Sequence, residues 1–417
     1  MDILVRKSEV YGRVNAPASK SLTHRFLVCA SLAEGKSVIR NPLICDDTLA
    51  TIDALEKLGV FISVDKDRVM VEGDGLKPSK SINCRDSGTT LRFLVGMCSL
   101  LEGESFLTGS KRLMQRPIQP LLCALNELGA DCRKVTNGIS VRGRVKGGDV
   151  TMRGDISSQF VSSLLLISPL TEKGVSITLT TELESKPYVM LTIESQKMFG
   201  IGVESEGVER FKVRPQTYRH ASVEVEGDWS SSSFLLAAGA VAGKVEVTGL
   251  NPRSLQADRK IIEVLRRMGA RVEIGGSTVT VEKTDEFLLI NLDVSDCPDL
   301  FPIVCILCSL AKGKSVITGI RRLRLKESDR VKAVATNLRR VGVHVNISGE
   351  SFVINGGSGN LKPSVIDSFN DHRIAMAFGV MGLVVDGILI RNAECVNKSF
   401  PDFWSKLRFL GADVNER

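Results

Sequence analysis

The chain has 417 residues, of which 43% are hydrophobic and 25% are charged, with a formal net charge of +7. This length and composition predict two or three globular domains, and the mildly basic charge fits small anionic substrates. Because aromatic residues make up only 5% of the chain and are not interleaved with basic runs, we expect no nucleic-acid partner. Residues 1–10 have the pattern of a strand rather than a targeting segment, and no apolar stretch has the length of a membrane span, so we expect a cytoplasmic protein with no membrane contact.

One structural unit repeats along the chain. A helix end, a glycine and a strand recur at intervals of about 70 residues. The glycines are Gly59, Gly129, Gly200, Gly269, Gly342 and Gly411. A second, glycine-led strand recurs in phase, for example as GKSVIRN from Gly35 and GKSVITG from Gly313. Near-constant spacing of two independent elements indicates six repeats.

Each repeat contains an apolar helix that follows a polar residue. The predicted starts are near Ser21, Ser87, Ser157, Ser230, Asp299 and Asp371. Apolar residues three and four apart predict the helices, and short β-branched runs predict the strands, in the order strand, helix, strand, helix, strand. A break near residues 214–225 divides the repeats into two groups of three, and we expect two domains that face each other across a cleft.

The predicted helix starts carry cations where a cation opposes the helix macrodipole. Lys20, Arg25, Arg92 and Arg373 lie in or close to these first turns. Each start taken alone is explained by Ser or Asp capping. A phosphate or carboxylate shared between the cations and the free backbone N–H groups would explain the set as a whole.

Charged loops precede helices in the remaining positions of the repeat. Arg116 stands before a proline, the segment 325–330 reads LKESDR, and Lys398 lies in NKSFP. Alone, such clusters are usually solvated surface, but their matching positions predict that they converge on anionic groups, which arginine binds in a bidentate manner.

The cysteines predict core packing rather than a metal or redox site. Cys305 and Cys308 form the CxxC spacing inside an apolar, helix-like run with no second pair nearby. We therefore expect no metal and no organic cofactor.

Ten segments in chain order resemble the enolpyruvyl transferase family and, within it, the EPSP synthases. They are PASKSLTHR, DSGTTLRF, LMQRPI, DISSQFVSSLL, SKPYV, EGDWSSSSFLLAA, CPDLFPI, RLKESDRV, NDHRIAMAF and NKSFPDFW. The resemblance implies an α/β fold of two similar domains, each made of three βαβαββ-type units in an inside-out α/β barrel, with the active-site cleft between them. It implies domains of residues 14–226 and of residues 1–13 with 227–417.

The resemblance also implies the reaction and its substrates. The enolpyruvyl group of phosphoenolpyruvate is transferred to the 5-hydroxyl of shikimate 3-phosphate, and phosphate is released by addition and elimination. The residues implied for shikimate 3-phosphate are Lys20, Ser21, Arg25, Ser157, Ser158, Gln159, Ser185, Tyr188, Asp299 and Lys326. Those implied for phosphoenolpyruvate are Lys20, Gly88, Arg116, Gln159, Arg330, Arg373 and Lys398.

The chemistry requires a base for the hydroxyl proton and an acid for the methylene carbon. We expect Asp299 to be the base and Glu327, with Lys20, to serve the methylene group. His372 either orients its neighbours or is a satisfied buried histidine. Asp86 and Arg322 depart from the asparagines that the family often has, and a carboxylate at 86 near phosphates requires a cap or an arginine partner.

Two other functions remain as alternatives. The sister enzyme that acts on UDP-N-acetylglucosamine would carry a reactive cysteine in the loop before Arg116, and residues 109–117 contain none. A non-catalytic RNA-end-binding protein of the same repeat would not explain Asp299 and Glu327 among the cations. We expect a monomer that closes on its substrates, and the resemblance implies sensitivity to glyphosate, for which Gly88 leaves room.

Overall fold

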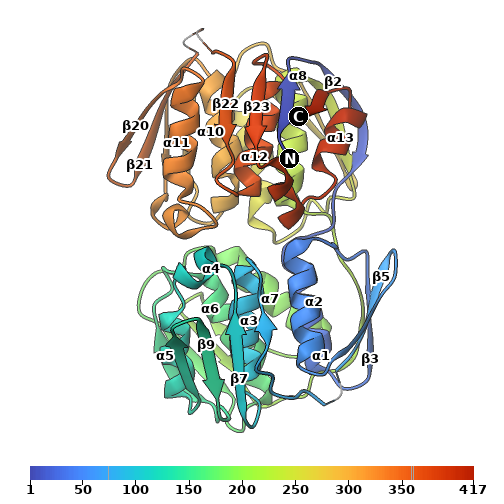
Figure 1. Ribbon diagram of the computed structural model, residues 1–417, viewed down its shortest axis with the longest axis vertical. Coiled ribbons are helices and arrows are strands. Elements are labelled where there is room, and N and C mark those ends of the chain that lie inside the picture. The colour runs from blue at the N-terminus through green and yellow to red at the C-terminus, as the bar shows by residue number, and fades with distance from the viewer. Residues whose placement is uncertain (74, 358, 360) are drawn as a thin grey trace. The chain divides into compact units, whose positions relative to one another are not determined.

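The computed structural model describes residues 1–73, 75–357, 359 and 361–417. It divides into two compact units (Figure 1). The continuous unit is Ala18–Val225, and the discontinuous unit is Met1–Pro17 together with Glu226–Arg417. Each unit has its own hydrophobic core. None of the helices formed by the described residues combines the length and apolar character that crossing a bilayer requires.

Each unit contains three four-stranded sheets of one topology, in which a parallel pair is followed by two antiparallel strands. In the continuous unit the strand orders are β14-β3-β5-β4, β6-β7-β9-β8 and β10-β11-β13-β12. Their bounds are β3 (Lys36–Arg40), β4 (Phe61–Val64), β5 (Arg68–Glu72), β6 (Ile82–Asn83), β7 (Glu104–Thr108), β8 (Asp131–Val135), β9 (Gly138–Arg142), β10 (Gly148–Met152), β11 (Val175–Leu179), β12 (Glu204–Glu206), β13 (Arg210–Val213) and β14 (Ser222–Glu224).

The sheets of the discontinuous unit have the orders β2-β15-β17-β16, β18-β19-β21-β20 and β22-β23-β1-β24. Their bounds are β1 (Ile3–Arg6), β2 (Val10–Asn15), β15 (Gly243–Thr248), β16 (Arg271–Gly275), β17 (Thr278–Glu282), β18 (Asn291–Asp293), β19 (Gly313–Thr318), β20 (His344–Ser348), β21 (Ser351–Gly356), β22 (Ser364–Asp367), β23 (Ile388–Arg391) and β24 (Asp413–Glu416). Strand β1 pairs with β23 and β24, and β2 pairs with β15, so both N-terminal strands belong to this unit.

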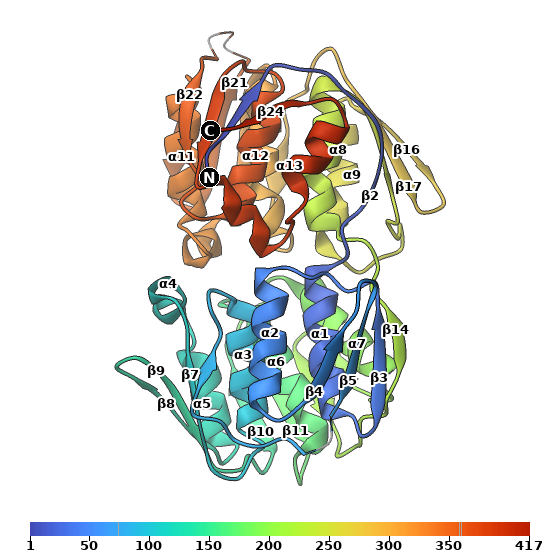
Figure 2. The same ribbon diagram turned by 45° about the vertical axis from the view of Figure 1, so that its right-hand side comes forward.

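The helices lie inside and the sheets outside. The continuous unit has α1 (Lys20–Leu32), α2 (Asp46–Lys57), α3 (Gly88–Cys98), α4 (Lys111–Gln115), α5 (Gln119–Glu127), α6 (Ser158–Ile167), η1 (Ser168–Leu170) and α7 (Lys186–Met198). Every residue of α1 from Leu22 to Leu32 is buried, whereas exposed and buried residues alternate along β3. A helix that is apolar on all sides must be enclosed, and a strand with one apolar face can cover it. Figure 2 shows β3, β4 and β5 outside the helices.

The discontinuous unit follows the same plan. Its helices are α8 (Trp229–Ala242), η2 (Ala257–Lys260), α9 (Ile261–Arg267), η3 (Pro298–Leu300), α10 (Phe301–Leu310), η4 (Arg321–Leu325), α11 (Arg330–Arg340), α12 (His372–Gly382), η5 (Ala393–Lys398) and α13 (Phe403–Phe409). Helices α8, α10 and α12 contact one another, and α8 is buried along its whole length. Cys305 and Cys308 lie on α10 as buried thiols, which confirms their prediction as core residues.

The six repeats have the expected helix starts and one more strand than the residue pattern predicted. Helices α1, α3, α6, α8, α10 and α12 begin within two residues of their predicted positions. The pattern alone gave three strands per repeat, but a hairpin such as β8–β9 closes each one. We expected domain boundaries at 13/14 and 226/227, whereas packing divides the chain after Pro17 and after Val225.

Candidate active site

In the continuous unit, hydrogen bonds hold the N-terminal ends of five helices together. We call the predicted residues at these ends the continuous-unit cluster: Lys20, Ser21, Arg25, Gly88, Arg116, Ser157, Ser158, Gln159, Ser185 and Tyr188. Helices α1, α2, α3, α6 and α7 contact one another in sequence around a ring, and α7 contacts α1. The cluster lies at the ring's N-terminal helix ends, where free N–H groups favour anions.

Lys20 has a counter-ion that the sequence did not identify. Its Nζ lies 2.8 Å from Asp47 Oδ2 at the start of α2, and their side chains are 14% and 11% exposed. Asp47 offsets the unfavourable interaction of Lys20 with the α1 dipole. Asp47 belongs to CDDT, an acidic helix start that could have signalled this role.

Arg25 joins α1 to α7. Its guanidinium donates to Thr192 Oγ1 at 2.8 Å, to Ser21 O at 2.8 Å and to Tyr188 O at 2.9 Å. Burial lowers the pKa of Arg25 to about 10. Arg25 is 3% exposed, so in this structure its contacts position Ser21 and Tyr188.

Gln159 is fixed by two residues of α3. Its Oε1 accepts from Arg92 at 2.9 Å, and its Nε2 donates to Thr89 Oγ1 at 2.8 Å. Ser157 caps α6 by accepting from the Gln159 backbone N–H at 3.3 Å. The starts of α3 and α6 are therefore adjacent, and Ser158 lies buried in the first turn.

Gly88 is the first residue of α3 and lies against two guanidinium groups. A Cβ at this position would be 2.4 Å from Arg92 Nη1 and 2.7 Å from Arg116 Nη1. Glycine thus permits the close approach of Arg116 to the helix N-terminus. Asp86 accepts from Ser110 Oγ at 2.5 Å, and Ser110 in turn caps α4.

Ser185 adopts the left-handed conformation, with φ of 56°, and is 3% exposed. A non-glycine residue in this region is strained, and such strain concentrates at functional sites. Ser185 is the residue before α7, and Tyr188 follows in the first turn.

The predicted residues of the discontinuous unit form a second group, the discontinuous-unit cluster: Asp299, Lys326, Glu327, Arg330, Arg373 and Lys398. Arg330 is its centre and is only 1% exposed. It donates to Asp299 Oδ1 at 2.6 Å, to Glu327 Oε2 at 2.9 Å and to Asp371 Oδ2 at 2.8 Å. These acidic partners hold the pKa of Arg330 above its ordinary value in spite of burial.

Asp299 is surrounded by cations. Its Oδ2 lies 2.9 Å from Arg373 Nη2, and its Oδ1 lies 3.9 Å from Lys326 Nζ. Burial opposes ionisation, but Arg373, Lys326 and Arg330 together hold the pKa of Asp299 below its ordinary value. Burial lowers the pKa of Lys326 to about 8, with Asp299 opposing the shift.

The start of α12 contacts Arg373 and Lys398, whereas Arg322 is held elsewhere. Asp371 caps the helix by accepting from the Arg373 backbone N–H at 3.1 Å. His372 is buried, and its Nδ1 lies 3.9 Å from Asp371 Oδ1. Lys398 is 7% exposed and donates to Asn370 O at 3.4 Å. Arg322 donates to Ser295 O at 2.7 Å.

The sequence did not identify Asp258, a completely buried carboxyl in η2. It accepts a short hydrogen bond from Ser230 Oγ in α8. Burial and repulsion by Asp299 raise the pKa of Asp258 to about 7. Its position beside Asp299 depends on how α8, η2 and η3 pack, which no sequence period encodes.

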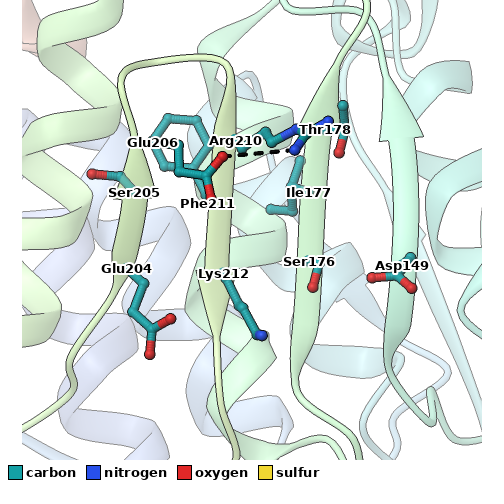
Figure 3. A pocket seen from close by; sticks show the side chains of 10 residues that line it. All are labelled: Asp149, Ser176, Ile177, Thr178, Glu204, Ser205, Glu206, Arg210, Phe211 and Lys212. Carbon is teal, nitrogen blue, oxygen red and sulfur yellow. Dashed lines mark ion pairs between the residues drawn. The ribbon is translucent and has the colours of Figure 1, made fainter.

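A hollow of about 380 Å³ on the outer face of sheet β10-β11-β13-β12 contains none of the predicted residues (Figure 3). Within it, Arg210 pairs with Glu206 at 3.6 Å. It is an ordinary charged sheet surface. Among the described residues, no group of three or more His, Cys, Asp or Glu side chains could hold a metal ion.

The fold and the two clusters define a class of α/β protein that gathers cations and carboxylates at buried helix ends. The family model for EPSP synthase (3-phosphoshikimate 1-carboxyvinyltransferase) matches residues 5–407, and the chain belongs to this family.

Curated relatives agree over the full length. The 3-phosphoshikimate 1-carboxyvinyltransferase of Methanocorpusculum labreanum is 41% identical, and the alignment covers 100% of each chain. That of Dehalococcoides mccartyi is also 41% identical with 100% coverage of both. The structure of EPSP synthase from Acinetobacter baumannii superposes with a TM-score of 0.82 at 27% identity, covering 100% of each chain. The enolpyruvyl transferase NikO from Streptomyces tendae has a TM-score of 0.81 at 17% identity, covering 99% of this chain and 98% of its own, and thus shows the common fold.

Proposed function

We propose that the protein is a 3-phosphoshikimate 1-carboxyvinyltransferase, which transfers the enolpyruvyl group of phosphoenolpyruvate to the 5-hydroxyl of shikimate 3-phosphate and releases phosphate. The observation that carries the proposal is Asp299, a carboxylate whose two oxygens lie 2.6 Å from Arg330 and 2.9 Å from Arg373. A site that only bound phosphates would gain nothing from a carboxylate among its cations. A reaction that removes a hydroxyl proton next to anionic substrates needs one.

Both clusters have the donors that the substrates require. In this proposal, phosphoenolpyruvate is bound by residues of both clusters. They are Lys20, Gly88, Arg116 and Gln159 of the continuous-unit cluster and Arg330, Arg373 and Lys398 of the discontinuous-unit cluster. Shikimate 3-phosphate is bound by Lys20, Ser21, Arg25, Ser157, Ser158, Gln159, Ser185, Tyr188, Asp299 and Lys326. The serines at the N-termini of α1, α6 and α7 supply hydroxyl donors together with helix N–H groups, which suits a phosphate.

The addition step forms a bond between the 5-oxygen of shikimate 3-phosphate and C2 of phosphoenolpyruvate. Asp299 accepts the hydroxyl proton, and the methylene carbon takes up a proton from Glu327 while the C2–C3 double bond is lost. In elimination, the C2–O bond to phosphate breaks, its electron pair leaves with phosphate, and C3 returns its proton to Glu327. The proton held by Asp299 passes to the departing phosphate, so both carboxyl groups return to their starting forms. Arg330, 2.9 Å from Glu327 Oε2, orients this carboxylate.

The ligand-free site holds Asp299 in a weakly basic form. The cations that depress its pKa are also the proposed ligands of the substrate anions. When phosphoenolpyruvate and shikimate 3-phosphate bring negative charge to Arg373 and Lys326, they weaken the stabilisation of ionised Asp299. Its pKa then rises towards a value suited to proton transfer. Substrate binding thereby activates the base.

The test is release of inorganic phosphate from purified protein supplied with both substrates. Phosphate release that depends on the presence of both substrates would support the proposal. The substitutions Asp299→Asn and Glu327→Gln should each lower kcat by about 100-fold or more. Release with UDP-N-acetylglucosamine in place of shikimate 3-phosphate would instead identify the sister activity. No release with either alcohol would overturn the proposal.

The finer assignments belong to the proposal as well. We propose a cytoplasmic monomer that binds neither nucleic acid nor membranes. Sedimentation of the purified protein tests its oligomeric state, and a second species at working concentration would contradict the monomer.

A further inference from the structure

A buried chain of hydrogen bonds crosses α1, α2 and α3 beneath the continuous-unit cluster. His24 Nδ1 is 2.8 Å from Thr51 Oγ1, and Thr51 Oγ1 is 2.7 Å from Thr90 Oγ1. Thr90 Oγ1 donates to Ser87 Oγ at 2.7 Å. All four side chains are at most 1% exposed. We call these residues the His24–Ser87 chain.

The chain ends on the residue that caps α3. Ser87 Oγ accepts the backbone N–H of Thr90 at 3.3 Å. The backbone N–H groups of Gly88 and Thr89 therefore precede the capped one and have no acceptor within the helix. They lie in the first turn of α3, which the guanidinium of Arg116 approaches across Gly88.

The same layer also holds Lys20. Thr90 Oγ1 lies 3.3 Å from the backbone carbonyl of Asp47, whose side chain pairs with Lys20. Two routes thus connect α1 to α3 through α2: His24 to Thr51, and Lys20 to Asp47. Both converge on Thr90.

We propose that His24, Thr51 and Thr90 are positioning residues that hold the first turn of α3 in the geometry that binds phosphoenolpyruvate. The inference rests on the proposed function. Burying three hydroxyls and an imidazole, contributed by three helices, costs more desolvation than an apolar core would, so these four side chains in one line are a poor choice for stability alone. They give the directional, short contacts that fix one helix against another.

The donors and acceptors have one consistent direction. Thr90 donates its hydroxyl proton to Ser87, so it must accept from Thr51, and Thr51 must in turn accept from His24 Nδ1–H. His24 is therefore the neutral Nδ1–H tautomer. Burial and the nearby charges of Lys20 and Arg25 support this, since they lower the pKa of His24 well below 6.5.

The experiment compares Thr51→Val and Thr90→Val with Ser195→Ala. Valine keeps the shape of threonine but lacks the hydroxyl. Ser195 is an equally buried hydroxyl that donates only to Leu191 O of its own helix, at 2.7 Å. We expect both valine variants to raise the KM for phosphoenolpyruvate by roughly three- to tenfold, with less than about twofold change for shikimate 3-phosphate. The variants Thr51→Ser and Thr90→Ser retain the hydroxyl group and should have the wild-type KM.

A purely structural role predicts another outcome. The valine variants, like Ser195→Ala, should then unfold at lower urea concentration than the wild type with both KM values unchanged, and this result would overturn the inference. A second measurement is independent of turnover: ¹⁵N chemical shifts of the His24 ring in the ligand-free protein. An Nδ1–H tautomer supports the inference, and an Nε2–H tautomer overturns it, even if the valine variants fail to fold. Absence of phosphate release by the wild-type protein would refute the proposed function and leave the tautomer result to decide the chain's direction.

Discussion

Arg330 Nη1 lies 2.6 Å from Asp299 Oδ1, although Arg330 is buried and Asp299 is the group proposed to accept a proton. The same guanidinium also binds Glu327 and Asp371. One arginine therefore sets the orientation of the proposed base and of the proposed acid. The discontinuous-unit cluster depends on this residue for its geometry before any substrate binds.

Replacing Arg330 should destabilise the protein strongly. In Arg330→Met, three buried or half-buried carboxylates lose their common counter-ion, and we expect the free energy of unfolding to fall by about 3–5 kcal/mol. Urea unfolding measures this loss. The control is Arg324→Met, because Arg324 is 43% exposed and lies 3.6 Å from Asp329, so the expected loss is below about 1 kcal/mol. Equal losses in the two variants would contradict the central position of Arg330.

Gly88→Ala should impair inhibitor binding more than stability. The new methyl group would meet Arg92 and Arg116 at their guanidinium ends, which must shift. We expect the inhibition constant of glyphosate to rise by roughly tenfold or more, because overpacking of this kind costs about 1–3 kcal/mol. Steady-state inhibition against phosphoenolpyruvate measures it.

Gly275→Ala is the matched control for that substitution. A Cβ at Gly275 meets no atom within 4 Å, and its φ is not in the left-handed region. The inhibition constant should stay at the wild-type value. An unchanged constant in Gly88→Ala as well would exclude Gly88 from the inhibitor site.

Binding of shikimate 3-phosphate should weaken as pH rises past about 8. The pKa of Lys326 is lowered to about 8 by burial, so the ammonium group that would bind the substrate becomes a neutral amine above that pH. In Lys326→Arg the side chain stays charged, and the alkaline fall in kcat/KM for this substrate should disappear or move to higher pH. The measurement is kcat/KM for shikimate 3-phosphate from pH 6 to 10 in the wild type and in Lys326→Arg. If kcat/KM falls at the same alkaline pH in both proteins, Lys326 does not have this role.

Asp258 predicts a specific dependence of stability on pH. Burial and Asp299 raise the pKa of Asp258 to about 7, so between about pH 4 and pH 7 the folded state holds a proton that the unfolded chain releases. This contribution to stability is complete below the ordinary pKa of 3.8 and is lost as pH rises through about 7. Asp258→Asn keeps a neutral side chain, and at pH 8 it should be more stable than the wild type by on the order of 3 kcal/mol.

Urea unfolding at pH 5 and pH 8 tests that prediction. The gain of Asp258→Asn should be smaller at pH 5 than at pH 8. Asp65→Asn is the control, since Asp65 pairs with Arg68 at 3.1 Å on the surface, and a change below about 1 kcal/mol is expected at both pH values. A variant less stable than the wild type at pH 8 would show that ionised Asp258 is stabilising.

The sequence could predict features that have a local signature. The helix starts at Lys20, Gly88 and His372 were predicted within one residue, because capping residues and apolar periodicity are local. The fold class followed from the repeat and the resemblance. The fourth strand of each repeat, such as β9, was missed although β9 is largely buried, because it is only five residues long and lies outside the two recurring elements that marked other strands.

Pairing between distant side chains had at most a weak signature, such as the acidic helix start that contains Asp47. The sequence suggested that Lys20 and Arg330 bind anions, but it did not show that Asp47 neutralises one and that three carboxylates surround the other. His24 and Asp258 were also missed. A single buried histidine or aspartate looks ordinary in a sequence until the packing of three elements brings its partners within hydrogen-bond distance.

The position of β1 has a consequence for the order in which the protein folds during synthesis. Strand β1 lies between β23 and β24 and cannot complete its sheet until those strands have left the ribosome, whereas Ala18–Val225 are all present halfway through translation. Strand β1 therefore emerges before the continuous unit but pairs after it, and its edges stay unpaired while the continuous unit folds.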